Sequence, residues 1–151
     1  MWDIIKRLFG TFERQKPQIE LLVATSHNAE VQIEELKLKK LYPCLLDSGQ
    51  DYVYTKSEDW AKVFEYIYFK FPMPKYLDAI FDCDDFAVLL KGLVSAFFGL
   101  NFFGVVFGWS PMGYHSWNLF NTENGLFCLE PQTGKYFPVG EQGYIAEYIL
   151  L

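Results

Sequence analysis

The chain has 151 residues, a length typical of one domain that buries a core without disulfide bonds. Aromatic residues make up 19% and charged residues 21%, which excludes intrinsically disordered, collagen-like, coiled-coil and disulfide-scaffold proteins. The formal net charge is −6 and the acidic excess lies in the second half of the chain. Such a surface repels phosphate backbones and attracts metal cations, so we expect no nucleic-acid partner.

The cysteines and the N-terminus indicate the compartment. Cys44, Cys83 and Cys128 form no Cys-x-x-Cys pair, so neither a disulfide framework nor a structural zinc site is expected. Residues 1–10 lack a signal-peptide pattern, and the apolar stretch 92–109 is interrupted by glycine and asparagine. We therefore expect a cytoplasmic protein without a transmembrane segment. Residues 1–12 have apolar side chains at helical spacing, typical of a helix docked on the core or, alternatively, of a membrane-interface anchor.

The predicted elements change from helices to strands along the chain. After strands at 19–24 and 52–55, apolar residues recur at i, i+3, i+4 and i+7 over 57–71 and 82–98, which predicts two helices. Ser57 and Asp82 are the expected N-caps, and Gly99 the expected C-terminal stop. Strands follow over 102–109, 115–120, 126–130, 135–139 and 144–151. This order predicts a single α+β domain in which the second helix packs on an antiparallel sheet. It has an N-terminal mixed part, 1–74, and a second part, 75–151.

Three polar residues are the candidates for chemistry. Cys83 lies in the first turn of the second helix, where the helix N-terminus favours a thiolate. His115 could act as the general base, and a third group would orient it. If residues 121–124 form the hairpin loop, His115 faces Glu130 on the same side of the sheet, while Asn118 points to the other side. Glu130 is therefore the preferred orienting residue and Asn118 the alternative.

The words FDCDDFA at 81–87, HSWN at 115–118 and LEPQT at 129–133 occur in this order. This order resembles the papain-like cysteine peptidases, in particular the C-terminal peptidase domain of the fairy-ring mushroom agglutinin and related phage and bacterial proteins. The resemblance covers roughly residues 75–151. It implies a papain-like fold with Cys83 as nucleophile, His115 as base and Glu130 as third residue.

The resemblance also implies a calcium ion, with Asp84, Asp85 and Gln132 as ligands, and with less support Glu130. The residues give an independent reason, because carboxylates beside Cys83 would disfavour its thiolate unless a cation neutralised them. Oxygen ligands suit calcium or manganese. The alternative is that Asp84 and Asp85 are ordinary acidic residues at a helix start.

The resulting functional hypothesis is a cysteine hydrolase, a thiol protease or amidase, that cleaves a peptide or protein substrate through Cys83, His115 and Glu130. Two alternatives stay open. One is a catalytically silent papain-fold binding protein, for example a phage-encoded factor that acts on a host protein. The other is a transglutaminase-type acyl transferase, which uses the same kinds of residue.

Overall fold

A computed structural model of the chain describes residues 16–25, 27–29, 31–32, 42–44 and 51–151. The predicted helix at 1–12 lies outside the described residues. The elements are β1 (Leu21–Ala24), β2 (Tyr42–Cys44), β3 (Tyr52–Thr55), α3 (Ser57–Lys70), α4 (Cys83–Phe98), β4 (Phe103–Ser110), β5 (Gly113–Thr122), β6 (Gly125–Glu130), β7 (Lys135–Pro138) and β8 (Ile145–Leu150). None of the helices described in full is both long and apolar enough to cross a membrane.

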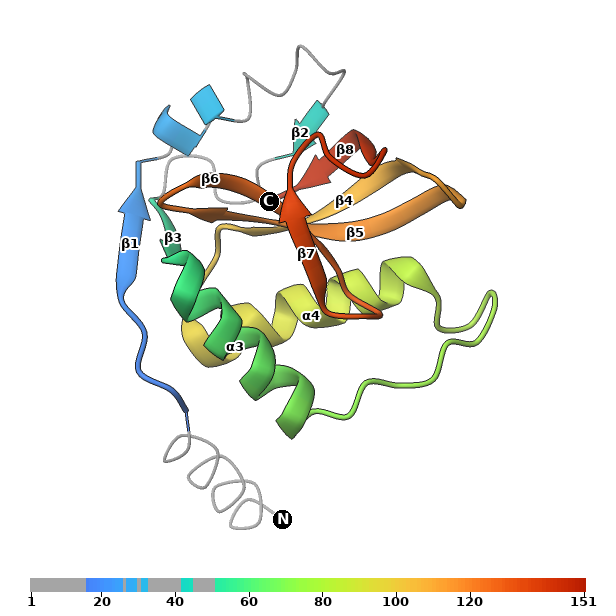
Figure 1. The fold of residues 1–151 in the computed structure, drawn as a ribbon, viewed down its shortest axis with the longest axis horizontal. Coiled ribbons are helices and arrows are strands. Elements are labelled where there is room, and N and C mark those ends of the chain that lie inside the picture. Colours follow the sequence, from blue (N-terminus) through green and yellow to red (C-terminus); the bar gives the residue numbers. More distant parts are fainter. Residues whose placement is uncertain (1–15, 26, 30, 33–41, 45–50) are drawn as a thin grey trace.

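A six-stranded sheet with the order β2-β8-β4-β5-β6-β7 forms the centre of the molecule (Figure 1). Its neighbouring strands are antiparallel except for β2, which pairs parallel with β8. Strands β1 and β3 form a separate antiparallel pair. Helices α3 and α4 pack against one face of the large sheet, and a second apolar cluster that includes Trp117 covers the other face.

The expected papain-like α+β fold with an antiparallel sheet is corrected by this architecture. Strands dominate the described chain, eight of them against the two helices α3 and α4. The large sheet is mixed, because residues 42–44 add a parallel strand at its edge. Periodicity along a single segment cannot reveal this pairing, since it joins residues about a hundred positions apart.

Helix α3 is fixed to the sheet by an aromatic cluster around Trp60. The centroid of the buried Trp60 ring lies 5.3 Å, 5.4 Å and 4.9 Å from the ring centroids of Phe64, Phe103 and Phe120. The Trp60 Nε1 donates a hydrogen bond to the Asn121 carbonyl at 2.7 Å. The helix begins at the predicted residue and ends one residue early. Its N-cap is Lys56 rather than the expected Ser57.

The N-terminus of α3 is capped by a residue from the β5–β6 turn, which is distant in the sequence. The Ser57 backbone N–H donates to Glu123 Oε2 at 2.7 Å. This hydrogen bond satisfies one of the free N–H groups that every helix start presents. It also lowers the pKa of the Glu123 carboxyl, because the N–H group favours its charged form.

Helix α4 confirms the predicted helix within one residue. Asp82 is its N-cap and forms a capping box with Asp85, whose Oδ2 accepts the Asp82 backbone N–H at 3.2 Å. Gly99 ends the helix in the left-handed conformation, φ 69°. The buried side chain of Asn118 joins the helix to the sheet, since its Nδ2 donates to the carbonyls of Ala87 at 2.9 Å and Gly104 at 3.0 Å.

The β5–β6 hairpin has a register different from the predicted one. Thr122 pairs with Gly125 and Phe120 with Phe127, so the turn contains two residues instead of four. The whole pairing is shifted by two positions. Because side chains alternate with a period of two, the shift leaves every residue on its predicted face.

Strands β4 and β8 approach each other unusually closely at Gly108, which pairs with Ala146 of β8 on one side and with His115 of β5 on the other. A Cβ atom built at Gly108 would lie 2.1 Å from the Ile145 carbonyl oxygen and 3.0 Å from the Trp117 ring. The β4–β8 register shifts between Phe107 and Gly108, which is typical of a bulge. Only glycine fits this backbone approach.

We predict opposite effects for two glycine-to-alanine substitutions. Gly108→Ala should lower the free energy of unfolding by about 3 kcal/mol, because the new methyl group collides with backbone. Gly92→Ala, inside α4 with open space around its Cβ, should raise it by about 0.5–1 kcal/mol. Urea unfolding followed by circular dichroism measures both. Equal effects of the two substitutions would contradict the close approach at Gly108.

Candidate functional site

A cavity of about 320 Å³ opens beside the N-terminal end of α4, and we call it the Cys83 pocket. Three parts of the chain meet there: the 71–82 loop with α4, the β4–β5 hairpin, and the turn after β6. Its lining residues are Tyr76, Cys83, Ser110, Met112, Tyr114, His115 and Gln132. The structure therefore brings Cys83 and His115, the two main candidates from the sequence, to one cavity.

His115 is held by the second residue that the sequence indicated. Its Nε2 lies 2.7 Å from Glu130 Oε2, and both side chains are buried. The same carboxylate oxygen accepts the Tyr144 hydroxyl at 3.2 Å, and Glu130 Oε1 accepts the Gln132 backbone N–H at 3.3 Å. Glu130 thus fixes the orientation of the imidazole and is itself fixed by two donors. Burial and the neighbouring Glu130 charge raise the pKa of Tyr144 to about 12, so this hydroxyl stays a donor at neutral pH.

Asn118, the alternative orienting residue, has another role. Its amide donates to α4 and β4 rather than to His115. The side chains of Asn118 and His115 lie on opposite faces of β5, as their separation of three residues predicts. Cys128 is buried in the core of the sheet, in agreement with the structural role expected for it. The side chain of Cys44 lies outside what the structure describes.

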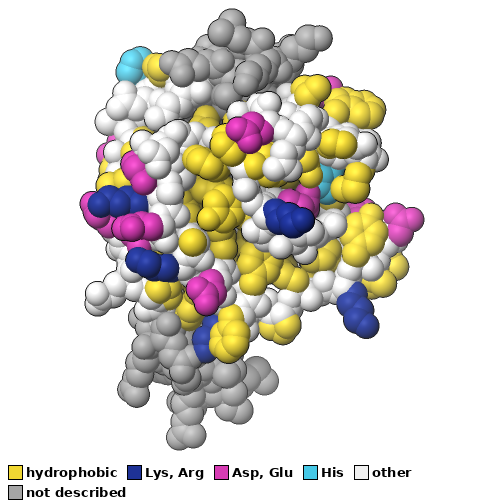
Figure 2. All heavy atoms as spheres, in the orientation of Figure 1, with side chains coloured by type: hydrophobic (Ala, Val, Ile, Leu, Met, Phe, Trp, Pro, Cys, Tyr) yellow, Lys and Arg dark blue, Asp and Glu magenta, His cyan; other side chains and the backbone are white. Residues whose placement is uncertain are grey.

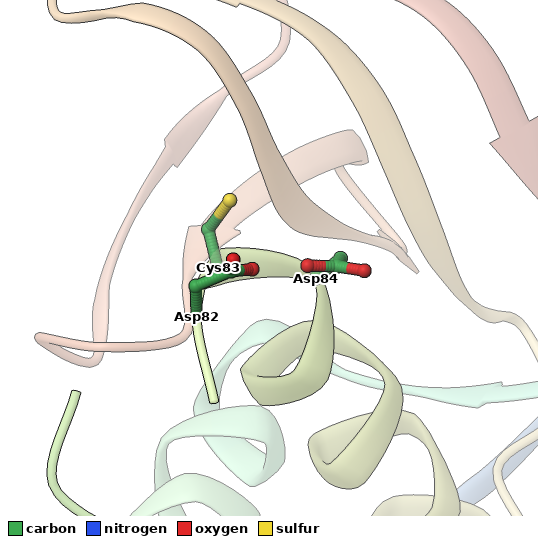
Figure 3. A group of neighbouring side chains, drawn as sticks. All are labelled: Asp82, Cys83 and Asp84. Atoms are coloured by element: carbon green, nitrogen blue, oxygen red, sulfur yellow. The ribbon is translucent and has the colours of Figure 1, made fainter. Parts of the chain in front are cut away.

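The thiol of Cys83 lies among carboxylates. Figure 3 shows its sulfur pointing away from α4, while the carboxylates of Asp82 and Asp84 point toward each other. The sulfur and one oxygen from each carboxylate all lie within 4.8 Å of one another. Burial raises the pKa of the Cys83 thiol, and the charges of Asp82 and Asp84 raise it further, although a hydrogen bond from the Ser116 backbone N–H opposes them. The site thus favours the protonated thiol.

The three predicted calcium ligands have different neighbours in the structure. The Asp85 carboxylate is engaged in the capping box, and Gln132 lines the Cys83 pocket. Asp84 lies beside Asp82, which the sequence places next to Cys83 and at the N-cap of the helix but not among the predicted ligands. A hydrogen bond with the Asp82 side chain is the main cause that raises the pKa of Asp84, followed by burial.

Sequence reasoning missed four residues of the site: Tyr76, Ser110, Met112 and Tyr144. Tyr144 follows a long turn after β7, and no spacing connects it to Glu130. Tyr76 lies in an irregular loop, and Ser110 ends β4 with its Oγ accepting the Met112 backbone N–H at 3.2 Å. Tyr114, which also lines the cavity, could have been found because it is next to His115 in the sequence.

Comparisons with known proteins give a fold but no family. No family model and no curated protein matches the chain. Several solved structures are similar, and two of them illustrate the likeness. One is described as a PSL1a–E64 complex, with a TM-score of 0.71, 23% identity, and coverage of 86% of this chain and 51% of that chain. The other is Polyporus squamosus lectin bound to the human-type influenza-binding epitope Neu5Acα2-6Galβ1-4GlcNAc, with a TM-score of 0.72, 23% identity, and coverage of 86% and 50%. This chain thus spans about half the length of each and shares its fold.

These findings overturn the identification as a papain-like cysteine peptidase, and we withdraw it. The solved structures that share the fold are a PSL1a complex and Polyporus squamosus lectin, and neither is described as a peptidase. The expected enzyme activities, hydrolysis and acyl transfer, are withdrawn with it. The structure gives a physical reason why the motif was misleading. Asp82 and Asp85 around Cys83 already have a structural role as a capping box, so the word FDCDDFA does not require an enzyme.

The carboxylates predict how Cys83 responds to pH. Removing one charge by Asp84→Asn should lower the pKa of the Cys83 thiol, because a like charge no longer opposes the thiolate. The rate of alkylation by iodoacetamide, followed at Cys83 by peptide mass spectrometry, should then begin to rise at a lower pH. Glu58→Gln, an exposed change on α3, should leave the profile unchanged. An unshifted profile in Asp84→Asn would contradict the placement of Asp84 beside the thiol.

Proposed function

We propose that this chain is a ligand-binding domain and that its ligand occupies the Cys83 pocket. The observation that carries this proposal is the cavity itself, about 320 Å³ in volume, with aromatic side chains and several polar groups converging on it. Cavities of this size, lined by aromatic residues and a few well-placed polar groups, are the usual ligand sites of proteins. The binding-protein alternative from the sequence is kept in this form, without the papain fold. A peptide or protein is proposed as the source of the ligand.

The rigid surroundings of the cavity support the proposal. His115 and Glu130 are buried and held by several hydrogen bonds, whereas Tyr76 and Tyr114 leave 53% of their surface exposed. A fixed polar base with exposed aromatic walls is pre-organised, which reduces the entropic cost of binding. The similar structures are both described as complexes, one with E64 and one with a trisaccharide. Their likeness to this chain shows the fold alone, so the two named ligands serve here as probes.

We predict that E64 binds in the Cys83 pocket. Titration calorimetry should show one equivalent bound. Cys83→Ala and Tyr114→Ala should each weaken binding about tenfold or more, because each removes a wall of the cavity. Phe69→Ala is the matched control, since Phe69 is an aromatic residue of α3 that is 79% exposed and does not line this pocket.

The trisaccharide Neu5Acα2-6Galβ1-4GlcNAc forms the second arm of this experiment. Binding of either probe that is unaffected by Cys83→Ala and Tyr114→Ala would place the ligand site elsewhere. Binding of neither probe would overturn the proposed function.

We also propose that a calcium or manganese ion binds at Asp84, with Asp82 rather than Asp85 as its second carboxylate. The supporting observation is the closeness of the Asp82 and Asp84 carboxylates, because their mutual repulsion raises the pKa of Asp84 and would be relieved by a bound cation. Carboxylate oxygens are the ligands that calcium prefers. The Cys83 thiol is a poor calcium ligand, and Asp85 is already engaged, so this chain supplies only part of a full coordination shell.

Calcium should stabilise the folded protein. After chelation, adding calcium to about a hundred times its Kd should raise Tm by about 5 °C or more. Asp84→Asn should abolish this calcium-dependent rise, whereas Asp78→Asn, a nearby exposed change outside the Asp82–Asp84 pair, should preserve it. No rise in the unmodified protein, or the same rise in Asp84→Asn, would leave Asp84 as an ordinary residue of a helix start.

A further inference from the structure

The chain segments around the Cys83 pocket are strongly acidic. Residues 71–90, 104–118 and 129–135 contain the lining residues, and residues 139–151 approach them, since the Tyr144 ring lies 6.2 Å from the His115 ring. Together they contain two lysines, Lys75 and Lys135, both exposed. Against these stand seven carboxylates: Asp78, Asp82, Asp84, Asp85, Glu130, Glu141 and Glu147. The lining itself contains neither lysine nor arginine.

The field of these carboxylates reaches both aromatic walls. Burial and the charges of Asp78 and Asp82 raise the pKa of Tyr76 on one side. Burial and the charge of Glu147 raise the pKa of Tyr114 on the other side. Because the two tyrosines come from separate parts of the chain, the negative potential is a property of the whole pocket mouth.

The mouth also presents aromatic faces to solvent. Tyr76 and Tyr114 are each 53% exposed and Trp109 is 50% exposed, and the Trp109 ring meets Tyr114 edge-on at 5.4 Å. The Trp109 Nε1 donates to Glu147 Oε1 at 3.0 Å, which holds a carboxylate beside the aromatic pair. On the right side of Figure 2, near the end of the β4–β5 hairpin in Figure 1, hydrophobic side chains lie with acidic ones among them.

We infer that the Cys83 pocket takes a positively charged organic group, an alkylammonium or a guanidinium, from its ligand. Aromatic faces attract such cations through their ring quadrupoles, and nearby carboxylates add Coulomb attraction. The same surroundings repel an anion, so the acidic sugar Neu5Ac of the lectin complex fits this pocket poorly. The inference rests on the proposed function, since it names the chemical class of ligand for the same site.

A matched pair of small probes tests the charge directly. N-acetyl-lysine methylamide and N-acetyl-norleucine methylamide have similar chains but differ in the terminal ammonium group. Binding to the full chain at pH 8 is measured by NMR chemical-shift titration in chelator. The lysine probe should bind about tenfold more tightly, and 0.5 M salt should remove most of this preference. Equal affinity of the two probes would overturn the inference.

Two substitutions outside the pocket lining connect the preference to its source. The double variant Asp78→Asn/Glu147→Gln keeps the side-chain shapes, including the acceptor for Trp109, and should reduce the preference for the lysine probe at least threefold. Glu58→Gln on α3 is the control and should not change it. An undiminished preference in the double variant would overturn the inference.

E64 binding separates this inference from the proposed function. If E64 binds in the pocket but the lysine probe shows no preference, the cation inference alone fails. If neither E64 nor the trisaccharide binds, the proposed function fails, and the cation inference, which rests on it, fails with it.

Discussion

The buried amide of Asn118 fixes helix α4 on the sheet, and the site depends on this contact. Its Nδ2 donates to a carbonyl of α4 and to a carbonyl of β4. Sliding the helix along the sheet would break both hydrogen bonds and leave buried polar groups unpaired, at a cost of about 1–3 kcal/mol for each. Cys83 lies one helical turn before Ala87, and His115 lies three residues before Asn118 on β5. One side chain thus sets how the thiol and the imidazole lie on either side of the cavity.

The electrostatics of the site combine opposing contributions. The N–H of Ser116 favours a thiolate at Cys83, but burial and two aspartates favour the thiol. On the other side of the cavity, the Glu130 carboxylate is buried with the imidazole and the Tyr144 hydroxyl as its partners. The site is therefore rich in acceptors and poor in fixed positive charge. A cation bound there would fill the cavity and would also shift the equilibrium at Cys83 from the thiol toward the thiolate.

Local sequence patterns predicted the helices and most strands of the second half of the chain. Each of these elements is recognised by the regular spacing of its own apolar residues, so no contact with a distant segment is needed to predict it. The same regular spacing explains why Glu130 was placed correctly beside His115 although the hairpin register was wrong by two residues. The parallel strand β2, the tyrosines Tyr76 and Tyr144, and the pairing of Asp82 with Asp84 could not be predicted, because each depends on chain segments that meet only in the folded protein. The family assignment failed for a related reason. The short sequence motif around Cys83 also serves to cap a helix, so its presence is not sufficient evidence for an enzyme.

The capping of α3 by Glu123 has a consequence for the order in which the protein is made. Helix α3 emerges from the ribosome more than fifty residues before the β5–β6 turn that supplies its N-terminal hydrogen bond and the carbonyl acceptor for Trp60. Until that turn has been synthesised, the start of α3 lacks the Glu123 carboxylate that accepts its Ser57 N–H. The contacts that complete α3 are thus non-local, and such contacts form late and slowly.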